Sequence, residues 1–439
     1  MKQYIWDELD AAQREDILRR PALAEDDRLQ SNVASILDRV RRGRDSALFE
    51  ITKELDGVEL DSLLVGEDEF ADAESSLAES HREAMAVAAA NIRKFHEAQL
   101  PRPVVVETAA GVVCERVTRA IESVGLYVPA GSAPLPSTAL MLSIPAAIAD
   151  CPTRILCTPP QADGRADPAV LVAARSNGVQ QVFKIGGAQA IAAMAYGTES
   201  VPKVQKLFGP GNAWVTAAKS QAAQDPLGAA RDMPAGPSEV LVIADESADA
   251  EFVAADLLSQ AEHGTDSQVV LVTTSGAVCL NVLEELETQQ KTLSRRDITA
   301  VSLESSIAIL VEDLDTALVV SNAYAPEHLI LQIENARTRL DDVQAAGSVF
   351  IGSWTPESVG DYCSGTNHVL PTYGFARSYS SLGVTDFLRS MTVQELSQSG
   401  LETIGPVAAT LADLEGLDAH SAAVTRRLDS IRRDPEAQS

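Results

Sequence analysis

The spacing of apolar residues along the chain changes near residue 100. Between about 26 and 100, apolar residues recur three or four positions apart, as Val33 and Leu37 do. This spacing is typical of helices that bury one face. Beyond this region the apolar residues gather in short runs, such as 121–128, which predict β-strands. The chain therefore starts with helices and continues with a different architecture.

From about residue 137 onward, segments of helical periodicity alternate with apolar runs typical of strands. The expected strands lie at 154–157, 181–185, 239–245, 268–273, 306–311 and 329–332, and the expected helices at 137–144, 169–176, 188–196, 248–262 and 277–288. This order is typical of parallel sheets covered by helices, with right-handed crossovers. The predicted fold class is α/β, with two Rossmann-like parallel-sheet domains, a helical N-terminal arm and a small helical C-terminal tail domain.

We predict four parts along the chain. Residues 1–24 form an arm with few apolar residues, which needs another surface to pack against. Residues 25–126 and 238–381 form a discontinuous first α/β domain that carries the catalytic chemistry. Residues 127–237 form a second α/β domain, and 382–439 form a tail whose pattern is helical.

Composition and charge narrow the classes of partner. The formal net charge of -28 argues against nucleic acid or an anionic membrane as a partner; adaptation to high salt is an alternative explanation for the acidity. The five cysteines are scattered, without CxxC spacing, as expected of reduced thiols in the cytosol. No segment has the apolar length of a signal peptide core or of a membrane span, so we expect a cytoplasmic protein.

Gln260 and His263 stand three residues apart near the expected end of the helix over 248–262, just before Gly264. Side chains at this spacing project from one face of a helix. A carboxamide and an imidazole that converge in this way could form half of a metal site with nitrogen and oxygen ligands. The alternative is a polar pair that only caps the helix.

Two glycine turns each lead from an expected strand into an expected helix, at Gly186-Gly187 and at Gly209-Pro210-Gly211. Glycine lets the backbone approach a ligand closely, and a helix amino terminus favours a phosphate. Neither turn has the GxGxxG spacing of the usual dinucleotide fingerprint. A tight connection without a ligand remains the alternative for each turn.

Further candidate residues follow in polar segments. Glu327 and His328 are adjacent and follow a proline, as a proton-transferring pair held in a rigid turn would be. Asp361 and His368 lie seven apart in a glycine-rich stretch over 359–372, which we expect to be a loop. Together with Gln260 and His263, they would suit zinc or a similar divalent ion. A metal-dependent hydrolase and a non-catalytic binding module are rival interpretations; the hydrolase would have no use for the glycine turns.

Several segments, taken in order, resemble those of the histidinol dehydrogenase family. They are Tyr-Val-Pro-Ala-Gly at 127–131 with Pro-Leu-Pro-Ser-Thr at 134–138, Lys-Ile-Gly-Gly-Ala-Gln at 184–189, Phe-Gly-Pro-Gly-Asn at 208–212, Met-Pro-Ala-Gly-Pro-Ser-Glu at 233–239, Ser-Gln-Ala-Glu-His-Gly at 259–264, Ala-Pro-Glu-His at 325–328, Gly-Asp-Tyr at 360–362 with Ser-Gly-Thr-Asn-His at 364–368, and Glu-Gly-Leu at 415–417 with His420. Each segment is a modest signal, but their common order over about 120–424 is highly specific.

The resemblance implies an enzyme that oxidises L-histidinol through L-histidinal to L-histidine, with zinc and NAD as cofactors, in histidine biosynthesis. It implies one zinc per subunit, with ligands at Gln260, His263, Asp361 and His420. The implied catalytic pair is Glu327 and His328. Besides His328 and the four metal ligands, the implied substrate contacts are Ser238, His368 and Glu415, and the implied NAD contacts are Tyr127, Gln189 and Asn212.

The resemblance also implies an intertwined homodimer, in which His420 and Glu415 of one chain complete the site of the other. In the implied chemistry, zinc orients the substrate, His328 takes the alcohol proton, and Glu327 helps a water molecule to add to the aldehyde. Two positions depart from the family pattern. Cys363 stands where a small residue without a thiol is usual, and Ala130 stands where a glycine is common. We interpret Cys363 as non-catalytic, because no adjacent base is evident in the sequence.

Overall fold

The computed structural model of the chain describes residues 1–20, 27–130 and 133–433. The internal contacts divide the chain into two compact units, Met1–Gln99 with Ile121–Phe387 (unit 1) and Leu100–Ala120 with Leu388–Ser439 (unit 2). The residues outside the described ranges are 21–24 of the predicted arm, 25–26 of the first predicted domain, Gly131 of the Tyr-Val-Pro-Ala-Gly segment, and 434–439 of the tail. The four-part division and its boundaries stay a prediction.

Unit 1 contains a six-stranded parallel sheet. Its order is β1 (Lys2–Ile5), β11 (Ile307–Leu310), β10 (Gln268–Thr273), β9 (Glu239–Ala244), β12 (His328–Gln332) and β13 (Ser348–Ile351), and every neighbouring pair is parallel. Every residue of β9, β10 and β12 is buried, as expected of parallel strands covered on both faces. The predicted alternation of strands and helices is confirmed.

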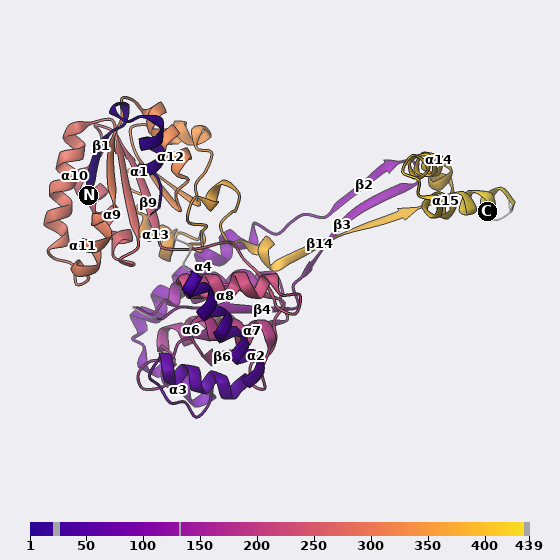
Figure 1. The fold of residues 1–439 in the computed structure, drawn as a ribbon, viewed down its shortest axis with the longest axis horizontal. Coiled ribbons are helices and arrows are strands. Elements are labelled where there is room, and N and C mark those ends of the chain that lie inside the picture. Colours follow the sequence, from indigo (N-terminus) through magenta and orange to yellow (C-terminus); the bar gives the residue numbers. More distant parts are fainter. Residues whose placement is uncertain (21–26, 131–132, 434–439) are drawn as a thin grey trace. The chain divides into compact units, whose positions relative to one another are not determined.

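Helices cover both faces of this sheet (Figure 1). Apolar residues of α9 (Ala250–Ala261), α10 (Gly276–Gln290) and α11 (Arg296–Glu304) form one buried cluster with alternate strand residues. Apolar residues of α12 (Leu314–Tyr324) pack with the remaining strand residues, whose side chains point to the opposite face of the sheet. Asp249, Ser275 and Asp313 cap the amino ends of α9, α10 and α12 by accepting backbone N–H groups, as these residue types commonly do.

The N-terminal arm is part of the six-stranded sheet. It consists of β1, a 3₁₀ turn at Trp6–Glu8 and the helix α1 (Ala11–Ile17). β1 pairs along β11 at the sheet edge, and Trp6 is buried in the cluster beneath it. The helical part of the arm is confirmed. The strand was not predicted, because none of its four residues is buried and the sequence therefore shows no alternation of apolar and polar residues there.

A second parallel sheet of unit 1 has the order β6 (Gln181–Lys184), β5 (Thr153–Thr158), β4 (Ser123–Tyr127), β7 (Lys206–Phe208) and β8 (Ala230–Arg231). Residues of α2 (Asp27–Leu55), α7 (Gly187–Tyr196) and α8 (Ala213–Gln224) form a buried cluster with one face of it. α5 (Pro136–Ile148) packs on β4 and on α6 (Pro168–Ser176). Two parallel sheets with N-terminal and C-terminal helices confirm the predicted fold class.

The remaining helices confirm the helical start of the chain, where α2 is followed by α3 (Glu67–Ser76) and α4 (Glu79–Glu97). His96 on α4 is fully buried and its Nδ1 donates to the Ile92 carbonyl at 2.8 Å, so it is a structural histidine. Further elements are α13 (Glu357–Tyr362) and 3₁₀ turns at Ala336–Asp342, Phe375–Arg377 and Val384–Phe387. Within the described ranges, none of the helices has the length and apolar character needed to cross a bilayer.

Unit 2 combines an antiparallel sheet with two helices. β3 (Val112–Ala120) pairs with both β2 (Val104–Ala109) and β14 (Leu388–Leu396), and α14 (Gln398–Leu414) packs on α15 (Asp418–Arg433). The prediction of a wholly helical tail is wrong for Leu388–Leu396. This segment is a strand because it pairs along its whole length with β3, which lies far away in the sequence.

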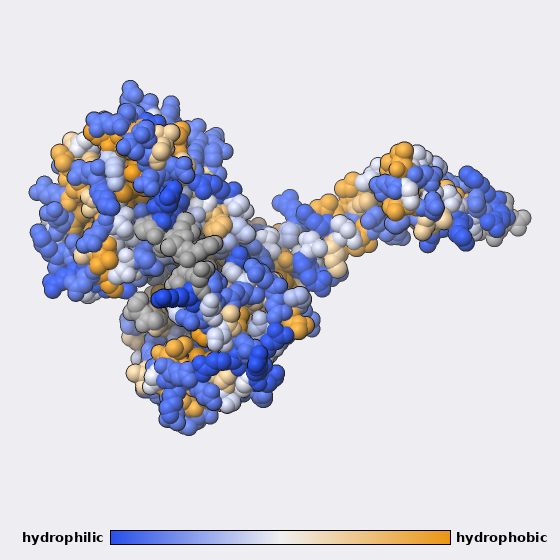
Figure 2. Space-filling view, viewed as in Figure 1, coloured by the Kyte–Doolittle hydropathy of each residue, from blue (hydrophilic) through white to orange (hydrophobic). Residues whose placement is uncertain are grey.

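Apolar side chains are exposed on both the strands and the helices of unit 2 (Figure 2). Those exposed by more than a third include Val105, Val106, Met391 and Val393 on the strands, and Val407, Leu411 and Leu414 on α14. Exposed apolar surface of this extent commonly marks a place where another surface packs.

Candidate active site

Three elements of unit 1 bring His328, Gln260 and the neighbouring Glu239 to one edge of the six-stranded sheet. Glu239 is the first residue of β9 and His328 the first of β12, and His328 lies beside Val240 in the register. In parallel βαβ units the helix runs back along the sheet, so its carboxyl end lies at the amino ends of the strands. The carboxyl end of α9 accordingly carries Gln260 to this edge.

Asp361 lies on the short helix α13 (Glu357–Tyr362), so the prediction of a loop beginning at 359 is wrong for its first residues. A Cβ atom at Gly360 would overlap the ring of Phe350, and glycine therefore lets this helix approach the sheet closely. Glu357 stands four residues before Asp361, which places both carboxylates on the same face of α13. Sequence reasoning missed Glu357, because the i, i+4 relation matters only in a helix.

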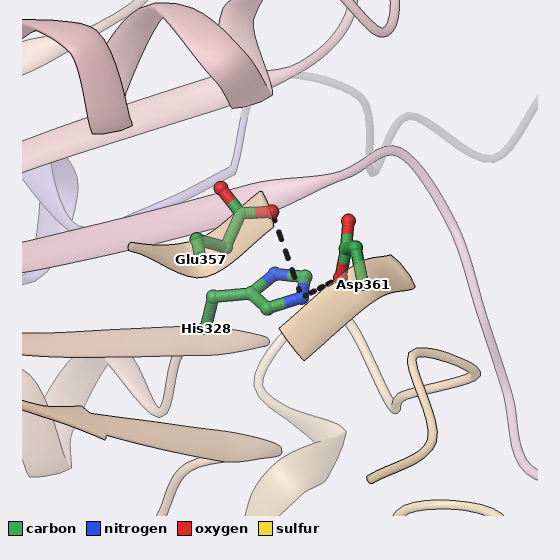
Figure 3. Close-up of side chains that lie close together, drawn as sticks. All are labelled: His328, Glu357 and Asp361. Carbon is green, nitrogen blue, oxygen red and sulfur yellow. Dashed lines mark ion pairs between the residues drawn. The ribbon is translucent and has the colours of Figure 1, made fainter. Parts of the chain in front are cut away.

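His328 has acceptors on both sides of its ring. Its Nδ1 lies 3.1 Å from the carbonyl oxygen of Glu239. Its Nε2 lies 3.3 Å from Oδ1 of Asp361 and 3.9 Å from Oε1 of Glu357 (Figure 3). A carbonyl oxygen can only accept a hydrogen bond, so Nδ1 carries a proton and donates a hydrogen bond to the carbonyl oxygen of Glu239. With Nδ1 bound in this way, Nε2 lies on the side of the two carboxylates of α13.

Glu327 is buried beside His328. Its Oε2 accepts the backbone N–H of Glu239 at 2.9 Å and lies 3.6 Å from Nδ1 of His328. Burial raises the pKa of Glu327 above its usual value, while His328 opposes that shift. A buried carboxyl group with a raised pKa, next to an imidazole, is suited to accept and return protons.

The ionisation of the other groups follows from burial and charge together. Burial disfavours the charged ring of His328, but Glu327, Glu357 and Asp361 outweigh it and raise the pKa of His328 well above its usual value. Burial raises the pKa of Glu357 to about 8. Burial also opposes ionisation of Asp361, yet its interaction with the nearby ring of His328 brings the pKa of Asp361 to about 2. Asp361 is the permanent anion of this group.

Several buried polar atoms at this edge have no hydrogen-bond partner among the described residues: Oε1 of Gln260, Oδ1 of Asp361, and Nε2 of both His328 and His368. Buried polar atoms are normally paired, and an ion is one explanation for such exceptions. Oxygen and imidazole nitrogen atoms are ligands that zinc accepts. One candidate ligand atom from each of His328, Glu357 and Asp361 also lies within 4.8 Å of the others. The donor set thus fits a divalent metal.

Glu357 also fixes the orientation of Gln260. The carboxylate of Glu357 accepts a hydrogen bond from Nε2 of Gln260 through one oxygen and from Oγ of Ser259, at 2.8 Å, through the other. Because the amide nitrogen of Gln260 is bound in this way, its oxygen is the atom left to face a metal. Partners of this kind commonly orient metal ligands.

The other predicted residues of unit 1 lie close to this group or border it. Charge interactions with His368 and His263 both lower the pKa of Asp361, so both rings are near its carboxylate. His263 is exposed and follows the end of α9, while His368 is half-buried. Ser238 is half-buried and immediately precedes β9.

Glu415 and His420 belong to unit 2. Glu415 is the C-terminal cap of α14, and His420 lies in the first turn of α15. Both side chains are exposed. The two residues are therefore accessible on unit 2.

The first glycine turn connects β6 to α7, and Gly187 has a φ of 60°. The hydroxyl oxygen of Tyr127 accepts the backbone N–H of Gly187 at 3.0 Å. Gln189, in the first turn of α7, is 2% exposed, and its Oε1 has no hydrogen-bond partner among the described residues. Two of the three predicted NAD contacts thus meet at the amino end of one helix.

The second glycine turn connects β7 to α8. Gly209 has a φ of 120°, and a Cβ atom there would overlap the carbonyl oxygen of Tyr127. Asn212 caps α8 by accepting the backbone N–H groups of Trp214 and Val215, at 3.1 and 3.2 Å. Both glycine turns therefore lie at carboxyl ends of parallel strands, where ligands of open α/β sheets commonly bind.

Known proteins match the chain over nearly its whole length. The sequence model of the family described as Histidinol dehydrogenase matches residues 18–428. Histidinol dehydrogenase of Vibrio vulnificus (strain CMCP6) is 54% identical over 431 residues, which cover 98% of this chain and 99% of that protein. The protein of the same name from Xanthomonas axonopodis pv. citri (strain 306) is 56% identical over 428 residues, with 98% and 99% coverage.

A solved structure agrees with these matches. The crystal structure of histidinol dehydrogenase from Elizabethkingia anophelis has a TM-score of 0.95 and 45% sequence identity to this chain, covering 98% of this chain and 99% of that one. Sequence and structure agree over the region that holds both parallel sheets and the buried group around His328. The chain belongs to the histidinol dehydrogenase family.

Proposed function

We propose that this protein oxidises L-histidinol to L-histidine through L-histidinal, with NAD as hydride acceptor and zinc as the resident metal. Besides family membership, the observation that carries the proposal is the buried group in which His328 and Glu327 adjoin unpartnered atoms of Gln260 and Asp361. The group combines proton-accepting side chains with a metal-binding donor set. An alcohol oxidation needs both a base and an oriented substrate.

Gln260, His263 and Asp361 would hold zinc in unit 1, with Glu357 keeping the amide of Gln260 in place. Zinc bound there would orient the imidazole and amino group of the substrate and supply positive charge beside the reacting carbon. His368 and Ser238, which border the group, would contact the substrate. The buried unpartnered oxygens of Gln260 and Asp361 support this assignment.

His328 would act as the base of the first oxidation. Its Nδ1 donates to the carbonyl of Glu239, so in the neutral ring Nε2 carries the lone pair. Zinc bound beside the ring would offset the carboxylate charges that raise the pKa of His328 and would favour this neutral form. In the first step, the carbinol C–H bond breaks as hydride leaves for NAD⁺, and Nε2 accepts the hydroxyl proton. The products of this step are the aldehyde and NADH.

Glu327 would act in the second oxidation, in which water must add to the aldehyde. Its buried carboxylate takes a proton from the water as the C–O bond forms, and a raised pKa favours that transfer. The aldehyde oxygen would meanwhile take the proton that His328 accepted in the first oxidation, which frees Nε2. The hydrate would then lose hydride to a second NAD⁺, while Nε2 of His328 accepts a hydroxyl proton. Each oxidation removes two electrons, so one histidinol reduces two NAD⁺.

The glycine turns would bind NAD. Gly187 and Gly209 let the backbone approach the cofactor at the starts of α7 and α8, where the helix dipoles favour its phosphates. Gln189 would use its unpartnered Oε1 as an acceptor, and Tyr127 would donate its hydroxyl hydrogen. Because the oxygen of Asn212 caps α8, Asn212 would contact NAD through its amide nitrogen.

We further propose that the protein works as an intertwined homodimer. His420 and Glu415 of the partner subunit would complete the metal and substrate sites. Two features of unit 2 support this arrangement: both side chains are exposed, and so are the apolar residues of α14, such as Leu414 at 78%. In a homodimer, a surface of the partner subunit would cover these apolar residues.

A mixed-dimer experiment tests the exchange. Gln260→Ala and His420→Ala subunits, each inactive alone, are coexpressed with different tags and the mixed dimers are isolated. If His420 acts in the partner, one of the two sites in each mixed dimer is intact, and activity returns to about half of the wild-type value. Mixed dimers without activity would contradict the exchange.

Removal of the metal tests the proposed cofactor. The protein stripped with a chelator should produce no NADH from L-histidinol and NAD⁺, and added zinc should restore production. Bound zinc, measured by elemental analysis, should reach one per subunit. NADH formation that is insensitive to the chelator would contradict the role of zinc.

We also propose a cytoplasmic location without nucleic-acid or membrane partners. All five cysteines are free in the structure, as is usual in reducing compartments. The net charge of -28 disfavours association with polyanions. Fractionation of cells that express the tagged protein would test the location, and recovery with membranes would contradict it.

A further inference from the structure

The backbone of Glu239 contacts both members of the Glu327–His328 pair. Its N–H donates to Oε2 of Glu327 at 2.9 Å, and its carbonyl oxygen accepts from Nδ1 of His328 at 3.1 Å. The first hydrogen bond fixes the carboxylate, and the second fixes the ring orientation. A displacement of this first residue of β9 would therefore move both groups together.

The side chain of Glu239 is held by an arginine from the N-terminal arm. Glu239 is 2% exposed, and its two oxygens accept hydrogen bonds from Nε and Nη2 of Arg20, each at 2.9 Å. Oε1 also accepts the backbone N–H of Tyr373 at 2.9 Å. Two parallel hydrogen bonds between a guanidinium and a carboxylate fix their relative orientation, which a lysine cannot reproduce.

Arg20 also contacts the segment that leads into Glu327. It is 7% exposed, donates to the carbonyl oxygen of Ala325 at 3.3 Å, and its guanidinium carbon lies 3.7 Å from the centre of the Tyr324 ring. Ala325 has a φ of 53°, a left-handed conformation that is costly for alanine unless its surroundings enforce it. Arg20 therefore joins the start of β9 to the turn before β12.

The arm itself is anchored to the sheet. β1 pairs with β11, and Trp6 is buried in the core below it. The arginine follows the helix α1 closely, so these anchors limit how far its backbone can move. A residue more than two hundred positions away in sequence from Glu239 is thus held in a fixed place at the catalytic edge.

From these contacts we propose that Arg20 is a positioning residue for the Glu327–His328 pair, acting through Glu239 and Ala325. This inference rests on the proposed function, because it assigns to Arg20 the alignment of that pair for proton transfer. The contacts of Arg20 are with Glu239, Ala325 and Tyr324, none of which is a proposed metal ligand. The effect of Arg20 is on the turnover number, since misplacing a reacting group by about 1 Å can cost roughly a hundredfold in rate.

A purely structural role makes a different prediction. A buried ion pair is weak support for stability, but its loss could still lower the melting temperature alone. In that case the folded fraction of a variant would keep its wild-type kcat. If Arg20 positions the pair, kcat falls in the fully folded protein, while KM for histidinol and the zinc content are unchanged.

The test uses Arg20→Ala in the full-length zinc enzyme, with Arg19→Ala as matched control. Arg19 is an exposed arginine that pairs only weakly with Glu15 and Asp16. We expect kcat of Arg20→Ala to fall by about a hundredfold and to be partly restored by millimolar guanidinium, which can occupy the vacated place. Arg20→Lys should fall between wild type and Arg20→Ala. The control should show neither effect.

A second variant keeps the test decisive if Arg20→Ala does not fold. The double variant Arg20→Met, Glu239→Gln removes both charges, so no unpaired buried charge remains. It should fold with normal zinc content and still show the reduced kcat. Its loss should be close to that of each single variant that folds, because the two residues act as one unit.

The outcomes separate the two proposals. If wild type oxidises histidinol and the folded Arg20 variants keep its kcat, the positioning role is wrong and the proposed function stands. The positioning role is also wrong if guanidinium restores nothing, or if the variants lose zinc instead of kcat. If wild type itself does not oxidise histidinol, the proposed function fails first.

Discussion

The two parallel sheets of unit 1 use opposite strand ends. In the six-stranded sheet, the candidate catalytic residues lie at the amino ends, where Glu239 begins β9 and His328 begins β12. In the five-stranded sheet, the glycine turns follow the carboxyl ends of β6 and β7. The first edge is made of buried charged side chains, and the second of backbone and helix amino termini.

This difference follows from the chemistry of each edge. The carboxyl end of a parallel strand leads into a helix amino terminus, which attracts anions without charged side chains. At the amino ends of the strands, carboxylates and imidazoles must supply the charge. Such groups need partners when buried, and Arg20 is the partner of Glu239 as Gln260 is of Glu357. Changes at the first edge should therefore affect chemistry and metal, and changes at the second should affect NAD.

The largest effect should come from His328→Gln. Loss of the base should lower kcat for both histidinol and histidinal by about 10²- to 10⁴-fold, while KM for NAD stays unchanged. Steady-state NADH formation from each substrate measures this. A variant that kept either half-reaction at the wild-type rate would contradict the assignment of His328 to both steps.

Glu327→Gln should separate the two oxidations. Glutamine still offers an oxygen to the N–H of Glu239, so the local structure is kept, but it cannot take a proton from water. The aldehyde step should slow by about a hundredfold and the alcohol step by less, as measured by single-turnover kinetics from each substrate. Equal losses in both steps would refute this division of roles.

Glu357→Leu should weaken metal binding. Without the acceptor that holds the amide of Gln260, zinc affinity should fall by about 10- to 100-fold in competition with a fluorescent chelator. Glu357→Gln is the matched control, because its oxygen can still accept the amide N–H, and it should lose less. Unchanged affinity in the leucine variant would show that Gln260 does not depend on Glu357.

Gly187→Ala probes the second edge. The φ of 60° at this residue should cost about 1–2 kcal/mol for alanine, and the added Cβ would lie 2.8 Å from Oε1 of Gln189. We expect KM for NAD to rise by about tenfold, the factor that 1.4 kcal/mol corresponds to, with zinc affinity unchanged. Gly276→Ala, at an open helix start, is the control. A loss of zinc in Gly187→Ala would break the separation of the two edges.

Cys363→Ala should have the smallest effect. Asn91 donates to the backbone carbonyl of Cys363 at 2.9 Å, a contact that alanine retains. Histidinal oxidation and zinc content should both stay at wild-type values. Loss of aldehyde oxidation with zinc retained would instead indicate a covalent step through the thiol.

The two edges also differ in how much of them could be predicted from sequence. The turns at Gly186 and Gly209 were predicted because strand, glycine and helix follow one another locally. Glu327 and His328 were predicted as a pair because they are adjacent and follow a proline. In each case the chemically relevant neighbours are close in sequence, so their geometry follows from local structure.

Long-range contacts explain what could not be predicted. Arg20 and Glu239 are 219 positions apart in the sequence, and Gln260 and Glu357 are 97 apart, so local patterns do not reveal either contact. β14 was missed because its partner is β3, far away in the chain. Asp361 was assigned to a loop because the stretch over 359–372 is rich in glycine, although Gly360 lets α13 lie close to Phe350.

The most direct test of the central claim is the ratio of NADH formed to L-histidinol consumed by the zinc-loaded protein. With excess NAD⁺, histidinol should be converted completely to histidine, identified by chromatography, with two NADH formed per molecule. This is the ratio that two successive oxidations at one site require. A ratio of one with histidinal released, or the absence of NADH, would contradict the account.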